Sequence, residues 1–371
     1  MEEFTQGNAI VYCQDAFNTT NGKTAHGLVR FTKRYKILCV IDSNHAGKDS
    51  GMILDNVPNN IPLVANLHEA LTCAKTQKKN PTHFIIGLAP DGGRLNPRAR
   101  EAVKAALKNK LNVDCGLHDF LSEDEEIKYL ADRFDVKIKD IRKPPHRNHL
   151  HFFSGKIEEV KSLKVAMLGT DSAIGKRTTA WILVNALNEL GYKTELVGTG
   201  QTAWLQGAKF SIVLDSLVND FVSGEIEHAV HNAWTQKNPD IIVIEGQGSL
   251  LNPAYPGGFE IIAAGRPDII VLQHAPARKE YDGFPGYAIH PLDKQIKAIE
   301  LISGKPVIAI TINHENMNET EIQKSIETIK KKQELPAFDV LKSGGKLLAK
   351  EVAKHIKNTK KKLNELVLDE S

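Results

Sequence analysis

The sequence predicts an α/β protein of two domains, each built on a mostly parallel β-sheet. Short apolar runs bounded by Gly, Asp or Asn recur along the 371 residues, and helix-length amphipathic segments lie between them. This alternation is typical of parallel α/β layers, because a crossover between parallel strands usually contains a helix. The length exceeds that of one ordinary domain and suits two. The periodicity lapses once near the middle, which indicates where the domains meet.

Five strands are predicted in the first half, each a short apolar run bounded by turn residues. They cover residues 8–13, 36–42, 61–64, 83–89 and 112–115. Amphipathic segments between them predict helices at residues 25–31, 67–76 and 97–108.

The segment from Asp140 to Gly155 breaks this order. It contains Pro144 and Pro145, which cannot donate backbone hydrogen bonds, and its periodicity is lost. We therefore predict a first domain of residues 1–145, a linker of residues 146–162 and a second domain of residues 163–371.

The second half restarts the alternation. Strands are predicted at residues 163–168, 193–197, 241–244, 269–272 and 306–312, and helices at residues 175–190 and 293–302. After Asn318 the chain is rich in lysine, but apolar residues still recur at helical spacing. A solvated helical face explains this better than a binding patch.

Composition excludes several classes of function. Lys plus Arg number 48 against 45 Asp plus Glu, so the net charge of +3 creates no strong field for nucleic acid or an anionic membrane. The four cysteines form no Cys-x-x-Cys pair, and no His/Cys metal spacing is present. No apolar stretch is long enough to span a membrane, and no secretory leader is recognisable. We expect a cytoplasmic protein with a small-molecule substrate and, like most soluble enzymes of this size, a homo-oligomeric state.

The strongest chemical signal lies between Lys164 and Thr179, where a strand, a glycine-bounded loop and a helix follow one another. Backbone N–H groups in such a loop surround an anion, the helix N-terminus points at it, and a lysine reaches the terminal phosphates. The pattern predicts a phosphate loop. Its candidate cofactor-binding residues are Gly169, Thr170, Asp171, Ser172, Gly175, Lys176, Arg177, Thr178 and Thr179.

This loop departs from the usual pattern at two points. Five residues rather than four separate Gly169 from Gly175, and Arg177 stands where a metal-binding Ser or Thr normally follows the lysine. Thr178 or Thr179 would have to hold Mg²⁺, or no Mg²⁺ is held there. The departures weaken ATP hydrolysis more than phosphate binding, because coenzyme A also carries a pyrophosphate.

Other strand ends carry candidate catalytic groups. Glu245 ends a β-branched strand that resembles a Walker-B strand, where a carboxylate can hold a metal or accept a proton. Asp215 lies in an apolar frame, and Arg278 follows another strand as a possible carboxylate clamp. A strand-terminating turn or a surface position remains the alternative for these residues. The candidate substrate-binding residues are Gly200, Gln201, Thr202, Gln247 and His274. A single histidine such as His274 more often has a structural role than a functional one.

The first domain carries weaker signals. Asp42 sits where a Rossmann ribose-binding acid would, but no Gly-x-Gly-x-x-Gly is present, which disfavours dinucleotide binding. The segments 90–94 and 116–119 follow strands and contain glycines that permit close approach of a ligand. Ordinary turns explain them equally well.

These motifs together carry a resemblance. The Gly-Thr-Asp-x-x-x-Gly-Lys loop resembles the phosphate loop of dethiobiotin synthetase and its relatives. Most of the chain resembles a two-domain family, long of unknown function, that includes D-glutamate N-acetyltransferase. The matching motifs are residues 87–93, 116–121, 140–145, 198–202, 215–227 and 245–250.

The resemblance implies an N-terminal Rossmann-like domain joined to a C-terminal P-loop NTPase-like domain. It also implies transfer of an acetyl group from acetyl-CoA to the amine of a D-amino acid, as part of D-glutamate catabolism. Such chemistry needs a base, oxyanion donors and a cation for the substrate carboxylate. The candidates for these roles are Glu245 or Asp215, the loop N–H groups and Arg278. Two rival functions stay open. One is an ATP-dependent ligase that uses Mg²⁺, and the other is a non-catalytic nucleotide-binding regulator.

Overall fold

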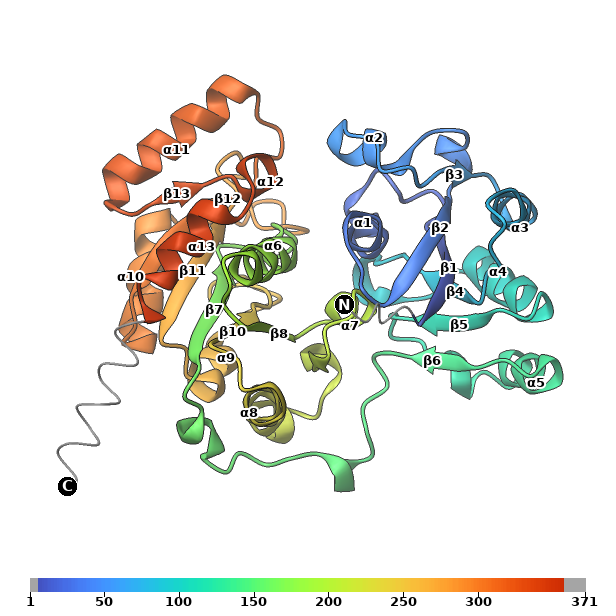
Figure 1. Ribbon diagram of the computed structural model, residues 1–371, viewed down its shortest axis with the longest axis horizontal. Helices are drawn as coiled ribbons and strands as arrows, with labels where there is room; N and C mark the ends of the chain where they lie inside the picture. Colours follow the sequence, from blue (N-terminus) through green and yellow to red (C-terminus); the bar gives the residue numbers. More distant parts are fainter. Residues whose placement is uncertain (1–5, 357–371) are drawn as a thin grey trace. The chain divides into compact units, whose positions relative to one another are not determined.

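The computed structural model describes residues 6–356, and it divides into two compact units (Figure 1). Among the described residues, unit 1 comprises residues 6–145 together with Gly200–Ala208, and unit 2 comprises His146–Thr199 together with residues 209–356. None of the helices in the described residues has the length and apolar character needed to cross a membrane.

Unit 1 is built on a six-stranded sheet whose order is β3-β2-β1-β4-β5-β6. All its paired strands are parallel. The strands are β1 (Gly7–Tyr12), β2 (Tyr35–Ile41), β3 (Leu63–Val64), β4 (His83–Ile86), β5 (Asn112–Cys115) and β6 (Ile138–Asp140). The order reverses between β1 and β4, as in doubly wound folds.

Helices connect these strands, and side-chain caps fix where several of them begin. Asn66 accepts a hydrogen bond from the Glu69 N–H at 3.0 Å, and Asn96 accepts one from the Ala99 N–H at 2.8 Å. Both helices therefore have the bounds expected from the sequence. The helices are α1 (Lys23–Arg30), α2 (Ser50–Asp55), α3 (Leu67–Thr76), α4 (Pro97–Lys108) and α5 (Glu125–Phe134).

A short segment from the second half of the sequence completes unit 1. It contains α7 (Gln201–Leu205), whose Thr202 hydroxyl lies 3.1 Å from that of Thr24 in α1. The Gln206 amide donates to the Gly27 carbonyl at 2.8 Å, and the Arg34 guanidinium lies over the Trp204 ring. The candidate substrate residues Gly200, Gln201 and Thr202 therefore belong to unit 1, although the predicted boundaries assigned them to the second domain.

Unit 2 is built on a seven-stranded sheet with the order β13-β12-β11-β7-β10-β8-β9. Its paired strands are also all parallel. The strands are β7 (Leu163–Gly169), β8 (Thr194–Gly198), β9 (Phe210–Ser211), β10 (Ile241–Glu245), β11 (Ile269–His274), β12 (Val307–Ile312) and β13 (Ala337–Phe338). The two parallel sheets confirm the predicted α/β class.

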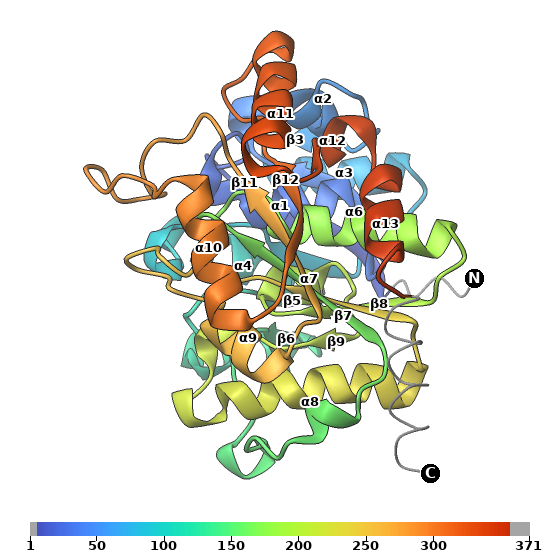
Figure 2. The same ribbon diagram turned by 90° about the vertical axis from the view of Figure 1, so that its left-hand side faces the viewer.

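Helices cover both faces of this sheet (Figure 2). Helices α6 and α13 pack together on one face, while α8, α9 and α10 pack against the other. Burial on both sides explains why the central strands read as unbroken apolar runs. The helices are α6 (Lys176–Glu189), α8 (Asn219–Lys237), α9 (Phe259–Gly265), α10 (Leu292–Ser303), α11 (Glu319–Gln333), α12 (Val340–Ser343) and α13 (Lys346–Ala353).

Residues 146–160, most of the predicted linker, form a strap on the surface of α8 in unit 2. The buried Glu227 carboxylate on α8 accepts hydrogen bonds from the N–H groups of Ser154 at 2.7 Å and Ile157 at 3.1 Å. The His151 ring stacks on the His228 ring with centroids 3.4 Å apart. Ile157 and Val160 belong to the unit 2 core. The strap is therefore a packed part of this unit.

Candidate functional site

The predicted phosphate loop joins β7 to α6. Gly175 adopts φ 94° as the N-cap of α6, a conformation that favours glycine, and Ala173 before it also has a positive φ of 51°. The N-cap residue Gly175 has no side chain that could occupy this helix end. A helix N-terminus carries partial positive charge and directs its first N–H groups outward, which is the arrangement that binds phosphate.

Lys176 opens α6 and turns back into this loop. Its side chain is buried, and its ammonium donates a hydrogen bond to the Asp171 carbonyl at 2.5 Å. The lysine thus lies at the position from which a phosphate-loop lysine reaches terminal phosphates.

Asp171 fixes the shape of the loop from inside. Its carboxylate is fully buried and accepts hydrogen bonds from four donors. They are the N–H of Ser172 at 2.7 Å, the Asn252 amide at 2.8 Å, the Arg278 guanidinium at 2.8 Å and the N–H of Asp282 at 2.9 Å. Three chain segments therefore meet on one carboxylate.

Arg278, the predicted carboxylate clamp, is engaged by groups of this chain. Its Nη1 donates to Asp171, and its Nε and Nη2 donate to the Glu315 carboxylate at 2.7 and 3.0 Å. Burial acts to lower the pKa of Arg278, but the hydrogen bonds to Glu315 and Asp171 outweigh it and raise this pKa. The guanidinium therefore braces the loop, and a substrate carboxylate would have to compete with Asp171 and Glu315 for it.

Residues at the end of β11 form hydrogen bonds with the phosphate loop and with α6. The His274 ring Nδ1 lies 3.0 Å from the Thr170 hydroxyl, and burial lowers the pKa of His274 to about 4, so this imidazole is neutral at pH 7. Gln273 accepts hydrogen bonds from Thr179 at 2.7 Å and Thr311 at 2.6 Å. The sequence analysis assigned no role to Gln273 or Thr311, although polar residues in two buried strands were the available signal.

Glu245 joins the ends of β10 and β8. Its carboxylate is buried and accepts a hydrogen bond from the Thr199 N–H at 2.8 Å. The Thr199 hydroxyl donates to the Glu245 carbonyl at 3.0 Å and accepts from the Gln247 amide at 3.0 Å. The Thr199 hydroxyl thus links Glu245 and Gln247, which belong to one motif of the sequence.

Ser249 is a polar group of this region that sequence reasoning missed. Its hydroxyl is buried, and no partner for it occurs among residues 6–356. The loop before it is tightly placed, because a Cβ on Gly246 would overlap the Met167 carbonyl oxygen and one on Gly248 would overlap that of Tyr255. A buried hydroxyl without a partner costs free energy unless a ligand or water completes it. No sequence pattern signals this.

Asp215, the second candidate base, lies in a short helical turn, Leu214–Ser216, and is exposed. Glu245 is buried at a strand end. The two candidates thus occupy opposite environments within unit 2.

The strand-end loops of unit 1 are held by their own side chains. Arg94 forms a 2.7 Å ion pair with Asp119, whose other oxygen accepts the Leu95 N–H at 2.6 Å. Asp42 is fully buried and bonds to the His45 ring at 2.7 Å and to the Asp15 N–H at 3.0 Å. Structural turns account for these contacts.

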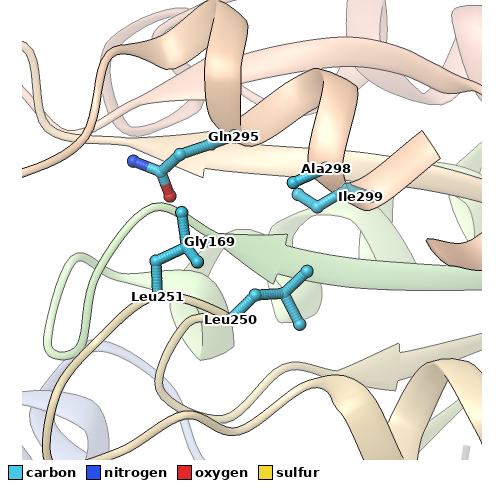
Figure 3. Close-up of a pocket in the computed structure, with 6 residues that line it drawn as sticks. All are labelled: Gly169, Leu250, Leu251, Gln295, Ala298 and Ile299. Atoms are coloured by element: carbon cyan, nitrogen blue, oxygen red, sulfur yellow. The ribbon is translucent and has the colours of Figure 1, made fainter. Parts of the chain in front are cut away.

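A small pocket lies beside the start of the phosphate loop (Figure 3). It leaves essentially no volume for a water-sized sphere. We interpret it as a packing gap rather than a ligand site. Its lining residues are Gly169, Leu250, Leu251, Gln295, Ala298 and Ile299.

Comparison with known proteins identifies the family. Residues 151–349 match the DUF1611 P-loop domain, and residues 43–144 match its Rossmann-like N-terminal domain, both described as domains of unknown function. A crystal structure of a DUF1611 family protein from Anabaena variabilis has a TM-score of 0.85 and 28% identity, and the match covers 94% of this chain and 99% of that one.

Two curated relatives carry a functional name. A D-glutamate N-acetyltransferase from Pseudoalteromonas sp. is 27% identical over 77% of this chain and 85% of its own length. A protein of the same name from Tritonibacter scottomollicae is 25% identical over 74% of this chain and 82% of its own length. The predicted resemblance is confirmed, and the chain belongs to the two-domain DUF1611 family.

Proposed function

We propose that this protein is an N-acetyltransferase that moves the acetyl group of acetyl-CoA to the amine of a D-amino acid of the glutamate type. The observation that carries the proposal is the 27% identity to a D-glutamate N-acetyltransferase over most of both chains. The phosphate loop at the N-terminus of α6 supports it, because acetyl-CoA carries a pyrophosphate that such a loop binds.

In the proposed complex, the coenzyme phosphates lie at the loop. Gly175 allows the chain to turn closely around a phosphate, and Lys176 supplies a cation at the start of α6. The Asp171 carboxylate keeps the loop in shape, since four donors converge on it. Binding the coenzyme then needs little ordering of the loop, which favours affinity.

The proposed reaction needs a base. The neutral amine attacks the thioester carbonyl carbon, the new C–N bond forms, and the C–S bond breaks as the coenzyme leaves as a thiolate. The proton lost by the amine passes through the base to that thiolate. Glu245 is the first candidate, because it is a buried carboxylate at the carboxyl end of a central strand, where open α/β sheets bind ligands. Asp215 is the second.

The test is an assay of thiol release from acetyl-CoA by the purified full chain. Thiol should appear with D-glutamate as acceptor and more slowly with L-glutamate, D-aspartate or D-alanine. Lys176→Ala should abolish both the thermal shift caused by acetyl-CoA and the activity, because it removes the loop cation. Lys209→Ala, which changes an exposed lysine of unit 2, is the matched control and should retain both.

The ATP-dependent ligase is the rival outcome of the same experiment. Stabilisation by ATP with Mg²⁺ but not by acetyl-CoA, together with release of ADP, would replace the acetyltransferase proposal with the ligase. Binding of either ligand without turnover of any acceptor would favour a regulator.

A further inference from the structure

The P-loop fold implies a Mg²⁺ ion beside the phosphates. In nucleotide-hydrolysing members, a Ser or Thr directly after the loop lysine and a Walker-B carboxylate hold this ion. Whether the chain suits Mg²⁺ therefore depends on what occupies these two positions and on where the side chains point.

The hydroxyl position does not fit. Arg177 follows Lys176 in the first turn of α6. Thr178 is displaced from that position by about 100° around the helix axis, since an α-helix has 3.6 residues per turn. Thr179 lies a further residue on, and its buried hydroxyl donates to Gln273 on β11 at 2.7 Å. Neither threonine occupies the direction that the metal-binding hydroxyl takes.

The carboxylate position does not fit either. Glu245 has the Walker-B place at the end of β10, but its Oε2 accepts the Thr199 N–H at 2.8 Å, at the end of β8. Asp171 within the loop is fully buried and already accepts four hydrogen bonds. No group of three or more His, Cys, Asp or Glu side chains in residues 6–356 is arranged to hold a metal ion.

The charges around the start of α6 suit an anion instead. Lys176 and Arg177 are consecutive residues of its first turn, and no acidic residue is present there. Cations at a helix N-terminus are opposed by the helix dipole, typically by several tenths of a kcal/mol each, and an anion bound there relieves that conflict. The nearby Asp171 charge is already compensated by Arg278 at 2.8 Å.

We propose that this phosphate loop binds a diphosphate group without a divalent metal, and that Arg177 supplies the positive charge that Mg²⁺ supplies in nucleotide-hydrolysing P-loop proteins. For acetyl-CoA as the ligand, this inference rests on the proposed function. The inference also deepens the proposed function, because acetyl transfer breaks no phosphate bond and needs no metal at the phosphates.

The test is isothermal titration of the full chain with CoA and, separately, with ADP, each in excess MgCl₂ and in EDTA. The two conditions should give dissociation constants that agree within about twofold. Arg177→Thr, which restores the usual hydroxyl position, should weaken binding in EDTA by about tenfold or more, the effect of losing one charged hydrogen bond. Arg147→Thr, which removes an exposed arginine from the strap, is the charge-matched control and should bind as the wild type does.

Arg177→Lys keeps the positive charge and should keep most of the affinity. The comparison of wild-type binding in MgCl₂ and in EDTA tests the inference even if a variant fails to fold. The inference is overturned if the affinity for CoA or for ADP is more than tenfold weaker in EDTA than in MgCl₂. CoA binding only with Mg²⁺ overturns it while the acetyltransferase proposal survives. ADP binding in EDTA without any CoA binding supports the inference and contradicts the acetyltransferase. If neither ligand binds under any condition, both are overturned.

Discussion

The Asp171 carboxylate and the Arg278 guanidinium form an ion pair of 2.8 Å inside the phosphate loop of unit 2. Asp171 is fully buried, and the remaining donors of Arg278 reach the Glu315 carboxylate and the Ser172 carbonyl. The pair therefore links the loop to the segments that follow β11 and β12. The conformation of the loop depends on a contact that spans 107 positions of sequence.

Replacing this carboxylate tests its role. Asp171→Asn removes the charge that balances Arg278 and replaces one acceptor oxygen by a donor that faces other donors. We expect a loss of about 3 kcal/mol in the free energy of unfolding, the usual cost of breaking a buried pair from one side. Urea denaturation measures this loss, with the exposed Asp132→Asn as control. A loss below about 1 kcal/mol would mean that the neutral donors alone hold the loop.

The two candidate bases can be separated by matched isosteric variants. Glu245→Gln can still accept the Thr199 N–H bond, so the fold should survive, but it can no longer take a proton. We expect its rate of acetyl transfer to fall by about a hundredfold or more, as for loss of a general base. Asp215→Asn, on an exposed turn, should retain most of the rate. The opposite ranking, with circular dichroism showing both variants folded, would move the role to Asp215.

Local signals were enough to predict much of the fold. The bounds of α3 and α4 agree with the ranges predicted from amphipathic spacing, and the structure shows an asparagine cap at the start of each helix. The phosphate loop was located because Gly175 and Lys176 are required at fixed positions by the backbone geometry itself. The ten strands predicted from apolar runs lie within a few residues of their expected bounds, whereas the short edge strands β6, β9 and β13 were not predicted.

Features that depend on distant contacts were not predictable. No local pattern signals that Gly200–Ala208 belongs to unit 1, since its partners in α1 lie more than 170 positions away. Helix α8 was not predicted. It packs against the sheet on one side and against the strap on another, so its apolar residues do not form a single stripe. The engagement of Arg278 depends on Glu315, 37 positions further along the chain.

His274 should make stability depend on pH. Its folded-state pKa is lowered by burial to about 4 from an ordinary 6.5. The unfolded chain therefore binds the proton more readily than the folded chain. The contribution of neutral His274 to the free energy of unfolding is present above about pH 6.5 and is lost as the pH falls toward 4. Proton linkage at His274 predicts that the free energy of unfolding falls by about 2 kcal/mol between about pH 7.5 and pH 5.

This loss can be isolated with His274→Asn, which keeps a polar partner for Thr170 but does not titrate. Over the same pH interval, the unfolding free energy of the variant should change by about 2 kcal/mol less than that of the wild type. Parallel pH profiles of the two proteins would show that His274 is protonated equally in the folded and unfolded states.

The packing of the strap on α8 predicts an inverted effect of a common helix substitution. A mid-helix Gly→Ala change normally stabilises a helix by about 1 kcal/mol. On α8, however, a Cβ at Gly224 would overlap the His151 carbonyl oxygen of the strap. Gly224→Ala should therefore lower stability, by about 2 kcal/mol, because the backbone of the strap must move away. The exposed Gln236→Ala on the same helix is the control and should be neutral or slightly stabilising.

Hydrogen exchange distinguishes this mechanism from a general loss of stability. The Ser154 N–H is protected by the Glu227 carboxylate at 2.7 Å, so a displaced strap should expose it. In Gly224→Ala, exchange in residues 146–160 should accelerate more than exchange in the strands of unit 2, because the overlap acts on the strap first. A raised melting temperature with unchanged exchange would mean that α8 and the strap adjust to the methyl group without separating.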